Sequence, residues 1–223
     1  MPVFVQIDSN RGLHSFTIVG LGDKAIQESI DRIEAAIKHS GFVPPRSKNK
    51  RFLVNLAPAD LKKEGPGYDL PIAIAYLIET QQLTLSVPPP LMRGELGLDG
   101  TLAHTNGGLT ATLKAKEHGV ESVIVPACNE QEASMVPDIT VYGATSLSEV
   151  VAHLSGEVSL GDRHGANNLA QGDRGVSHGD RGRAPSANMV TGSAKLGAKY
   201  DVTTLSPSLS PPLDDSLAHI RGQ

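Results

Sequence analysis

Apolar residues at alternate positions mark the first strands of the chain. Val3, Val5 and Ile7 alternate with polar residues, and the same alternation returns at Phe16 and Ile18 after a turn that contains glycine. A period of two is typical of strands with one buried face. We therefore predict that these two segments form a β-hairpin.

A helical period follows over residues 23–40. Its isoleucines recur every three or four positions and so share one helix face: Ile26, Ile30, Ile33 and Ile37. Gly41 comes next, and glycine is the residue that most often ends a helix. An amphipathic helix is predicted here.

The segment 51–77 reads as a strand, a turn and a helix. Residues 51–56 form the strand, and Gly65-Pro66-Gly67 lies in the turn. The helix that follows is apolar nearly all round, and Asp69 is its predicted N-cap. Strand–turn–helix units commonly present a nucleophile or hold a phosphate. This turn contains no serine, cysteine or histidine, which argues against a catalytic role.

The remaining elements interleave in the same way. We predict a hairpin over 93–102 that turns at the two residues Asp99-Gly100. It is followed by a helix over 108–118, a strand over 122–125, a short helix over 130–135, a strand over 140–142 and a helix over 147–154. Strands and helices that alternate along a chain define a mixed α/β class.

The periodic pattern ends near residue 155. Residues 156–212 contain an irregular repeat, GDRHG at 161–165 and GDRG at 172–175 and 179–182, and then serine- and proline-rich stretches. Too little apolar material is present to offset the ordering entropy. We interpret 1–155 as a folded domain and 156–212 as a disordered low-complexity linker. Each arginine of the repeat stands beside an aspartate, which favours a solvated spacer over a nucleic-acid contact.

Composition and motifs narrow the function. The chain has 223 residues, one cysteine and a formal net charge of −4, so no global basic field attracts it to nucleic acid. No signal peptide or membrane-length apolar run is present, which predicts a cytoplasmic protein with no membrane contact. The chain lacks the G-x-S-x-G motif of a nucleophile elbow, the Walker loop that binds nucleotide phosphates, and histidines at metal-ligand spacing. No catalytic residue, metal or cofactor is therefore predicted in this chain.

Basic residues gather at 46–51, between the first long helix and the next strand. This basic run has two interpretations: a solvated loop, or a patch that contacts nucleic-acid phosphates. The second interpretation adds two lysines of the later turn, so the candidate DNA-binding residues are Arg46, Lys48, Lys50, Arg51, Lys62 and Lys63.

Several blocks in fixed order resemble the N-terminal domain of Mg-chelatase-like AAA+ proteins of the YifB/ComM type. The matching stretches are SFTIVGLGDKAIQESIDRIEAAIKHSGF at 15–42, FLVNLAPADLKKEGPGYDLPIAIAYL at 52–77, RGELGLDGTL at 93–102, VIVPACNEQEASMV at 123–136 and VYGATSLSEVVAHLSG at 141–156. Residues 213–223 are similar to the start of that family's AAA+ module. The resemblance implies that this chain is the front portion, or a truncated version, of a longer protein.

The resemblance also implies a fold similar to the catalytic domain of Lon protease and the second domain of ribosomal protein S5. In Lon-like proteases a serine follows a Gly-Pro pair, and a lysine follows a Gly-Gly-Leu block. Here Gly67 stands at the serine position and Thr110 at the lysine position. Both members of the Ser–Lys dyad are missing, so the resemblance implies the fold without the protease chemistry.

Three functions follow from the resemblance. The first is a non-catalytic accessory domain of an ATPase that assembles as a hexamer and acts on DNA as a branch-migration helicase in natural transformation. ATP and Mg²⁺ are then expected only at an AAA+ module that this chain lacks. The second is an accessory role for a magnesium chelatase in tetrapyrrole synthesis. The third, which the missing dyad disfavours, is a Lon-type peptidase.

Overall fold

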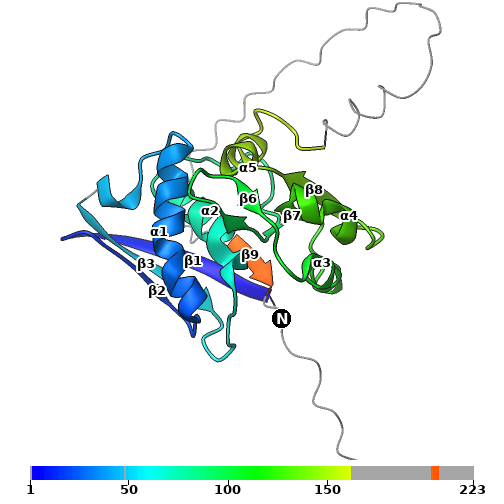
Figure 1. The fold of residues 1–223 in the computed structure, drawn as a ribbon, viewed down its shortest axis with the longest axis horizontal. Coiled ribbons are helices and arrows are strands. Elements are labelled where there is room, and N and C mark those ends of the chain that lie inside the picture. Colours follow the sequence, from blue (N-terminus) through cyan, green and yellow to red (C-terminus); the bar gives the residue numbers. More distant parts are fainter. Residues whose placement is uncertain (1, 48, 162–201, 206–223) are drawn as a thin grey trace, which may run out of the picture.

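A mixed four-stranded sheet forms one half of the fold (Figure 1). The computed structural model describes residues 2–47, 49–161 and 202–205. The strands of this sheet lie in the order β2-β3-β1-β9. Their bounds are Ser15–Val19 for β2, Lys50–Ala57 for β3, Pro2–Arg11 for β1 and Val202–Leu205 for β9.

The predicted pairing of the first two strands is wrong. β3 lies between them, antiparallel to β1 and parallel to β2. β3 is thus an inner strand of the sheet. Its side chains Phe52 and Val54 are fully or almost fully buried. Alternation identified both strands correctly, but a period of two does not define which strand pairs with which.

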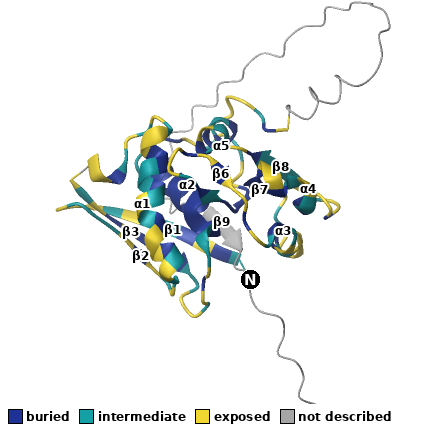
Figure 2. Cartoon of the chain, in the orientation of Figure 1, coloured by how far each residue is buried: buried dark blue, intermediate teal, exposed yellow. Residues whose placement is uncertain are grey.

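Two helices cover one face of this sheet. α1 spans Lys24–His39 and buries Ile26, Ile33 and Ile37, which confirms the predicted helix. α2 spans Asp69–Glu79 and is buried along nearly its whole length (Figure 2). The Tyr76 ring of α2 packs edge-on against Phe52, with 5.1 Å between ring centroids. This contact joins the buried helix to the central strand.

The second half of the fold is built on a parallel sheet in the order β4-β7-β8. Its strands are β4 Leu91–Met92, β7 Ser122–Pro126 and β8 Thr140–Ala144. The helices of this half are α3 Gly108–Glu117, α4 Glu130–Ala133 and α5 Leu147–Leu154. Short 3₁₀ turns lie at η1 Pro45–Ser47, η2 Pro66–Tyr68 and η3 Ala127–Asn129. The mixed α/β class is confirmed.

The predicted hairpin over 93–102 is present with a longer turn. Its strands are β5 Glu95–Leu96 and β6 Leu102–Ala103, which pair antiparallel. The Gly97 amide donates to the Thr101 carbonyl at 2.8 Å, so three residues form the loop where two were predicted. Gly100 has φ +85°, a conformation that glycine adopts without strain.

The structure describes two parts of the predicted linker, and one of them differs from the prediction. Residues 157–161 carry no helix or strand, as predicted. Val202–Leu205, however, form strand β9 on the edge of β1. The segment has three β-branched residues in a row, a composition that favours a strand. The rest of the linker and the expected start of an AAA+ module at 213–223 lie outside the described residues.

None of the helices within the described ranges is both long and apolar enough to cross a membrane. The same ranges hold no group of three or more His, Cys, Asp or Glu side chains arranged to bind a metal.

Candidate functional site

The turn at residues 63–67 is held in place by the start of α1. The Asp23 carboxylate accepts hydrogen bonds from the Ile26 amide and from the Gly65 amide, each at 3.0 Å. Lys63 adds two backbone hydrogen bonds at 3.2 Å, from its amide to Leu21 and from the Asp23 amide to its carbonyl. Gly65 adopts φ +81°. The turn is therefore positioned by the same residue that caps the helix.

Gly67, which the resemblance matches to the serine of a Lon-like dyad, is buried against Arg93. A Cβ atom on Gly67 would lie 2.9 Å from the Arg93 Cζ atom, closer than real contacts allow. Arg93 is 4% exposed, and its Nε donates to the Asn106 carbonyl at 3.3 Å. Burial lowers the pKa of the Arg93 guanidinium. The space in which a nucleophilic side chain would stand is thus taken by an arginine.

A pocket of about 280 Å³ remains beside this contact. Residues 64–67 form one wall and residues 104–107 the other, with Arg93 and Glu95 between them. Thr110, which the resemblance matches to the lysine of the dyad, is exposed on α3 and does not line the pocket.

The wall at 104–107 is fixed by two residues that the sequence did not point to. The Asn129 side chain accepts from the Thr105 amide at 3.0 Å and donates to the Thr105 carbonyl at 2.9 Å. Glu132 accepts from the Leu109 amide at 3.0 Å, at the start of α3. A short polar side chain that pairs with a distant loop has no local sequence signal, so only the fold reveals it.

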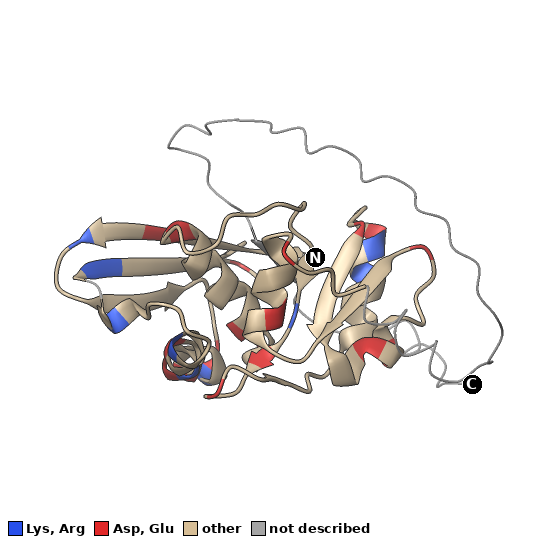
Figure 3. Cartoon of the chain, turned by 90° about the horizontal axis from the view of Figure 1, so that it is seen from above, with Lys and Arg blue, Asp and Glu red and all other residues tan. Residues whose placement is uncertain are grey.

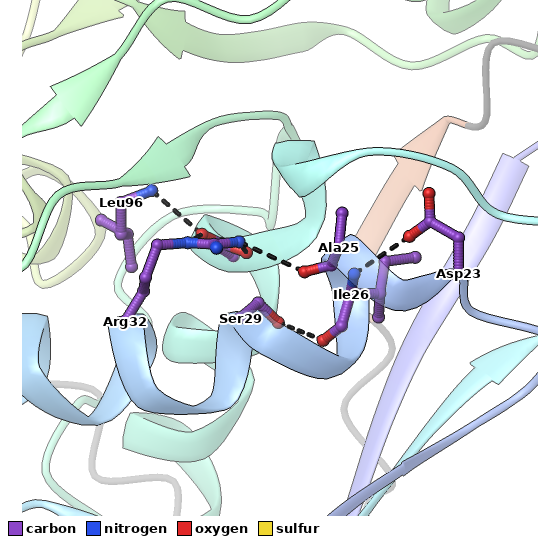
Figure 4. Close-up of polar contacts among 7 residues, drawn as sticks. Asp23, Ala25, Ile26, Ser29, Arg32 and Leu96 are labelled. Carbon is purple, nitrogen blue, oxygen red and sulfur yellow. Dashed lines mark hydrogen bonds and ion pairs between the residues drawn. The ribbon is translucent and has the colours of Figure 1, made fainter.

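Asp69 is not an N-cap, which corrects the prediction. It is the first residue of α2, and its buried carboxylate instead accepts from Arg32 Nε at 2.9 Å and from the Leu96 amide at 3.3 Å (Figure 4). Burial raises the pKa of Asp69 to about 6, although the hydrogen bond from Arg32 acts in the opposite direction. The carboxylate joins α1, α2 and the β5–β6 hairpin. Glu95 of this hairpin lines the pocket.

The structure does not bring the predicted basic residues together. Lys50 and Arg51 begin β3, whereas Lys62 and Lys63 follow its other end. β3, which is about 23 Å long, lies between the two pairs along the chain. Lys48 lies outside the described residues. The candidates that the structure describes therefore do not form one patch.

Several of these cations are also neutralised or hidden. Arg46 pairs with Asp31 at 3.0 Å and with Glu34 at 2.7 Å. Lys62 pairs with Glu64 at 2.5 Å. Lys63, expected to be exposed, is fully buried, and its Nζ donates to the Pro58 carbonyl. We remove Lys63 from the candidate DNA contacts.

A smaller basic cluster forms where β1 ends and β3 begins. Arg11 lies directly opposite Lys50, and Asn10 lies opposite Arg51. Lys and Arg segments gather at this outer end of the sheet in Figure 3. In the described part of the chain, none of the three cations has a carboxylate within 4 Å. We call Arg11, Lys50 and Arg51 the basic tip.

Arg11 was absent from the sequence-based candidates. It belongs to a different stretch of the chain, and only the antiparallel register of β1 and β3 places it beside Lys50. Arg11 and Arg51 are exposed, so both can reach a ligand.

Comparisons with known proteins give one consistent family. The family described as "Subunit ChlI of Mg-chelatase" matches residues 5–129. The chain is 38% identical over 160 residues to "Uncharacterized protein YifB" of Escherichia coli (strain K12), which covers 71% of this chain and 31% of that protein.

Two further relatives agree. "Competence protein ComM" of Haemophilus influenzae is 39% identical over 159 residues, 71% of this chain and 30% of that protein. "Uncharacterized protein Mb2921c" of Mycobacterium bovis is 38% identical over 162 residues, 72% of this chain and 32% of that protein. The chain spans about a third of the length of these relatives.

Proposed function

Because the chain belongs to the family of the Mg-chelatase subunit ChlI and is of the YifB/ComM type, we propose that it is the non-catalytic N-terminal accessory domain of a Mg-chelatase-like AAA+ ATPase. In this proposal the full-length protein assembles as a hexamer and acts as a branch-migration helicase in natural transformation. ATP and Mg²⁺ bind to its AAA+ module, and this domain supports ring assembly and DNA engagement. The name of one relative, "Competence protein ComM", supports the link to competence.

The contact between Gly67 and Arg93 carries the non-catalytic part of the proposal. A serine at position 67 would need the space that the Arg93 guanidinium occupies. Thr110 is an exposed threonine, so the residue at this position is not a lysine that could act as a base. A Ser–Lys peptidase needs both groups within hydrogen-bond reach of each other.

Casein at neutral pH tests this part directly. We expect no cleavage by the chain, with or without ATP, and no gain of cleavage in a Gly67→Ser variant. Cleavage by the wild-type chain that disappears in a Gly67→Trp variant would establish a peptidase and overturn the proposal.

The basic tip supports the DNA part of the proposal. Three cations without a nearby carboxylate partner in the described residues can neutralise phosphates, and phosphate contacts make binding salt-dependent. We expect weak, salt-sensitive binding of branched or single-stranded DNA by fluorescence anisotropy. A variant with Arg11→Gln, Lys50→Gln and Arg51→Gln should lose most of it.

A second triple variant provides the matched control. Lys24→Gln, Arg46→Gln and Lys62→Gln removes the same number of charges, but each of these cations already pairs with a carboxylate. Loss of the tip should flatten the slope of log K against log salt by about 0.7 to 0.9 for each phosphate contact. Equal binding by both triple variants would remove the tip from the proposal.

The family description favours one alternative, an accessory role for a magnesium chelatase in tetrapyrrole synthesis. The two roles predict different ligands. Stimulation of magnesium insertion into a porphyrin by the full-length protein, together with no DNA binding, would favour the chelatase role. DNA binding that depends on the basic tip, without such stimulation, would favour the proposed role.

A further inference from the structure

The end of helix α5 is covered by the residues that follow it. Glu157 and Val158 each donate a backbone hydrogen bond to the Ala152 carbonyl, at 2.9 and 3.2 Å. Leu160 then packs into the main hydrophobic core and is only 2% exposed. The segment 159–161 therefore closes the core at this end of α5.

His153 of α5 holds this segment through its ring. The Leu160 amide donates to the His153 Nδ1 atom at 3.3 Å, and this hydrogen bond is buried. His153 is 8% exposed, and its ring packs on Tyr142 of β8 with 4.6 Å between the ring centroids. A backbone amide can only donate, so Nδ1 carries no proton and the ring is neutral.

Protonation of the ring removes this contact. With a proton on Nδ1, the Leu160 amide would face a second donor, and two donors cannot form a hydrogen bond. The new positive charge would also lie away from water, where an uncompensated charge is unfavourable.

The surroundings of His153 keep the ring neutral at neutral pH. Burial lowers the pKa of His153 below 6.5, although a hydrogen bond with the Val158 backbone acts in the opposite direction. The neighbouring titratable groups are Tyr142 on β8 and Glu157 in the turn after α5. Neither of these, nor any other charged side chain of the described residues, contributes to the lowered pKa.

We propose that His153 is an acid-sensitive latch: the neutral ring holds residues 159–161 on α5, and the protonated ring releases them and exposes Leu160. Because the hydrogen bonds to the Ala152 carbonyl do not involve the ring, the release begins after Val158 and leaves helix α5 intact. The latch involves no residue of the basic tip, so it does not depend on the proposed DNA function.

The direction of the pH dependence follows from the two states of the segment. In the released state His153 has its ordinary pKa of 6.5, whereas burial in the docked state lowers this pKa. The released state therefore binds the proton more tightly, so the docked state loses stability as pH falls below 6.5. Above pH 6.5 the contribution is constant.

Amide hydrogen exchange on the complete chain tests the latch. The protection factor of the Leu160 amide, which is corrected for the intrinsic pH dependence of exchange, should fall about tenfold between pH 7.5 and pH 4.5 because one hydrogen bond is lost. The fall should follow the titration of the His153 ring, measured by nuclear magnetic resonance on the same samples. The amides of Val151 and Leu154 in α5 should keep their protection.

Two substitutions separate the acceptor from the charge. Asparagine carries an oxygen acceptor near the position of Nδ1 and does not titrate, so His153→Asn should keep the Leu160 amide protected at both pH values. Phenylalanine has the shape of the ring without an acceptor, so His153→Phe should leave this amide poorly protected at both. His118→Asn is the matched control, because His118 is exposed at the end of α3, and this variant should respond to pH as the wild type does.

Three results would overturn the latch. The first is a Leu160 protection factor that does not change with pH in the wild type. The second is an equal fall in the His153→Asn variant, which would assign the pH response to another group. The third is a loss of protection throughout α5 together with Leu160, which would mean that the helix unfolds as a whole.

Discussion

Asp23 binds Gly65 across the start of helix α1. One oxygen of its carboxylate accepts from the Ile26 amide and the other from the Gly65 amide, each at 3.0 Å. The first bond caps the helix, and the second fixes the turn that forms a wall of the pocket. A single side chain thus determines both where the helix begins and where the turn lies.

Asp23→Ala should lower the free energy of unfolding by about 2 kcal/mol. Loss of a helix cap costs about 1 kcal/mol, and the unpaired Gly65 amide adds about 1 kcal/mol. Urea denaturation measures the change. Asp31→Ala is the matched control on the same helix, because its exposed pair with Arg46 should contribute less than about 1 kcal/mol. Equal losses in the two variants would contradict the assigned role of Asp23.

Gly67→Ala tests the packing of the turn against Arg93. The new Cβ would lie 2.9 Å from the Arg93 Cζ atom, and Arg93 is buried and held by Asn106. We expect a loss of about 1–3 kcal/mol from overpacking, measured by thermal or urea unfolding.

Gly108→Ala is the control for that substitution. Gly108 is the first residue of α3, and a Cβ there would meet the Asn129 Cβ at an ordinary 3.5 Å. Alanine reduces the entropy of the unfolded chain, so this variant should be neutral or more stable by up to about 1 kcal/mol. A Gly67→Ala variant as stable as Gly108→Ala would show that Arg93 moves aside freely.

The Asp69–Arg32 pair should make stability depend on pH in an unusual direction. Burial raises the pKa of Asp69 from 3.8 to about 6, so the folded state keeps this proton over a range in which the unfolded state has lost it. The free energy of unfolding therefore falls as pH rises from about 4 to about 6, by up to about 3 kcal/mol from this group. Above pH 6 the contribution is constant.

Asp69→Asn isolates the effect, because the variant cannot titrate at this position. Urea denaturation of both proteins at pH 4 and pH 7 gives the difference in stability between them. That difference should shift against the wild type as pH rises. A difference that is constant, or that shifts in favour of the wild type between pH 4 and pH 7, would mean that the Arg32 hydrogen bond offsets or outweighs the burial of Asp69.

Helix α1 was predicted correctly, because the features that define it are local. Helix α1 has a periodic apolar face, an aspartate before it and a glycine after it, all of which lie within its own segment. The hairpin of β1 and β2 was wrong because strand pairing depends on β3, which is distant in sequence. Strand β9 was missed because its four residues stand among serines and prolines.

The candidate site likewise combines features that the sequence shows with features that depend on residues distant in sequence. The identities of Gly67 and Thr110, the residues that the resemblance matches to a Ser–Lys dyad, can be read from the sequence. The arginine that covers Gly67 cannot, because Arg93 reaches the turn through the tertiary fold. The basic patch was partly wrong for the same reason: adjacent lysines at 62 and 63 differ completely in exposure, and Arg11 joins the tip only through the sheet register.

Lys63 provides the last test, because a buried ammonium lowers stability unless it is well compensated. Burial lowers the pKa of Lys63 below 10.5, so the unfolded state binds this proton more tightly than the folded state. The free energy of unfolding should therefore rise as pH increases toward 10.5.

Lys63→Met keeps the length of the side chain without the charge, and should be more stable than the wild type at pH 7 by on the order of 1 kcal/mol. Its advantage should shrink at pH 10, whereas Lys62→Met, at an exposed position, should show no such change between the two pH values. A Lys63→Met variant that is less stable at pH 7 would mean that the hydrogen bond to the Pro58 carbonyl outweighs the cost of burying the charge.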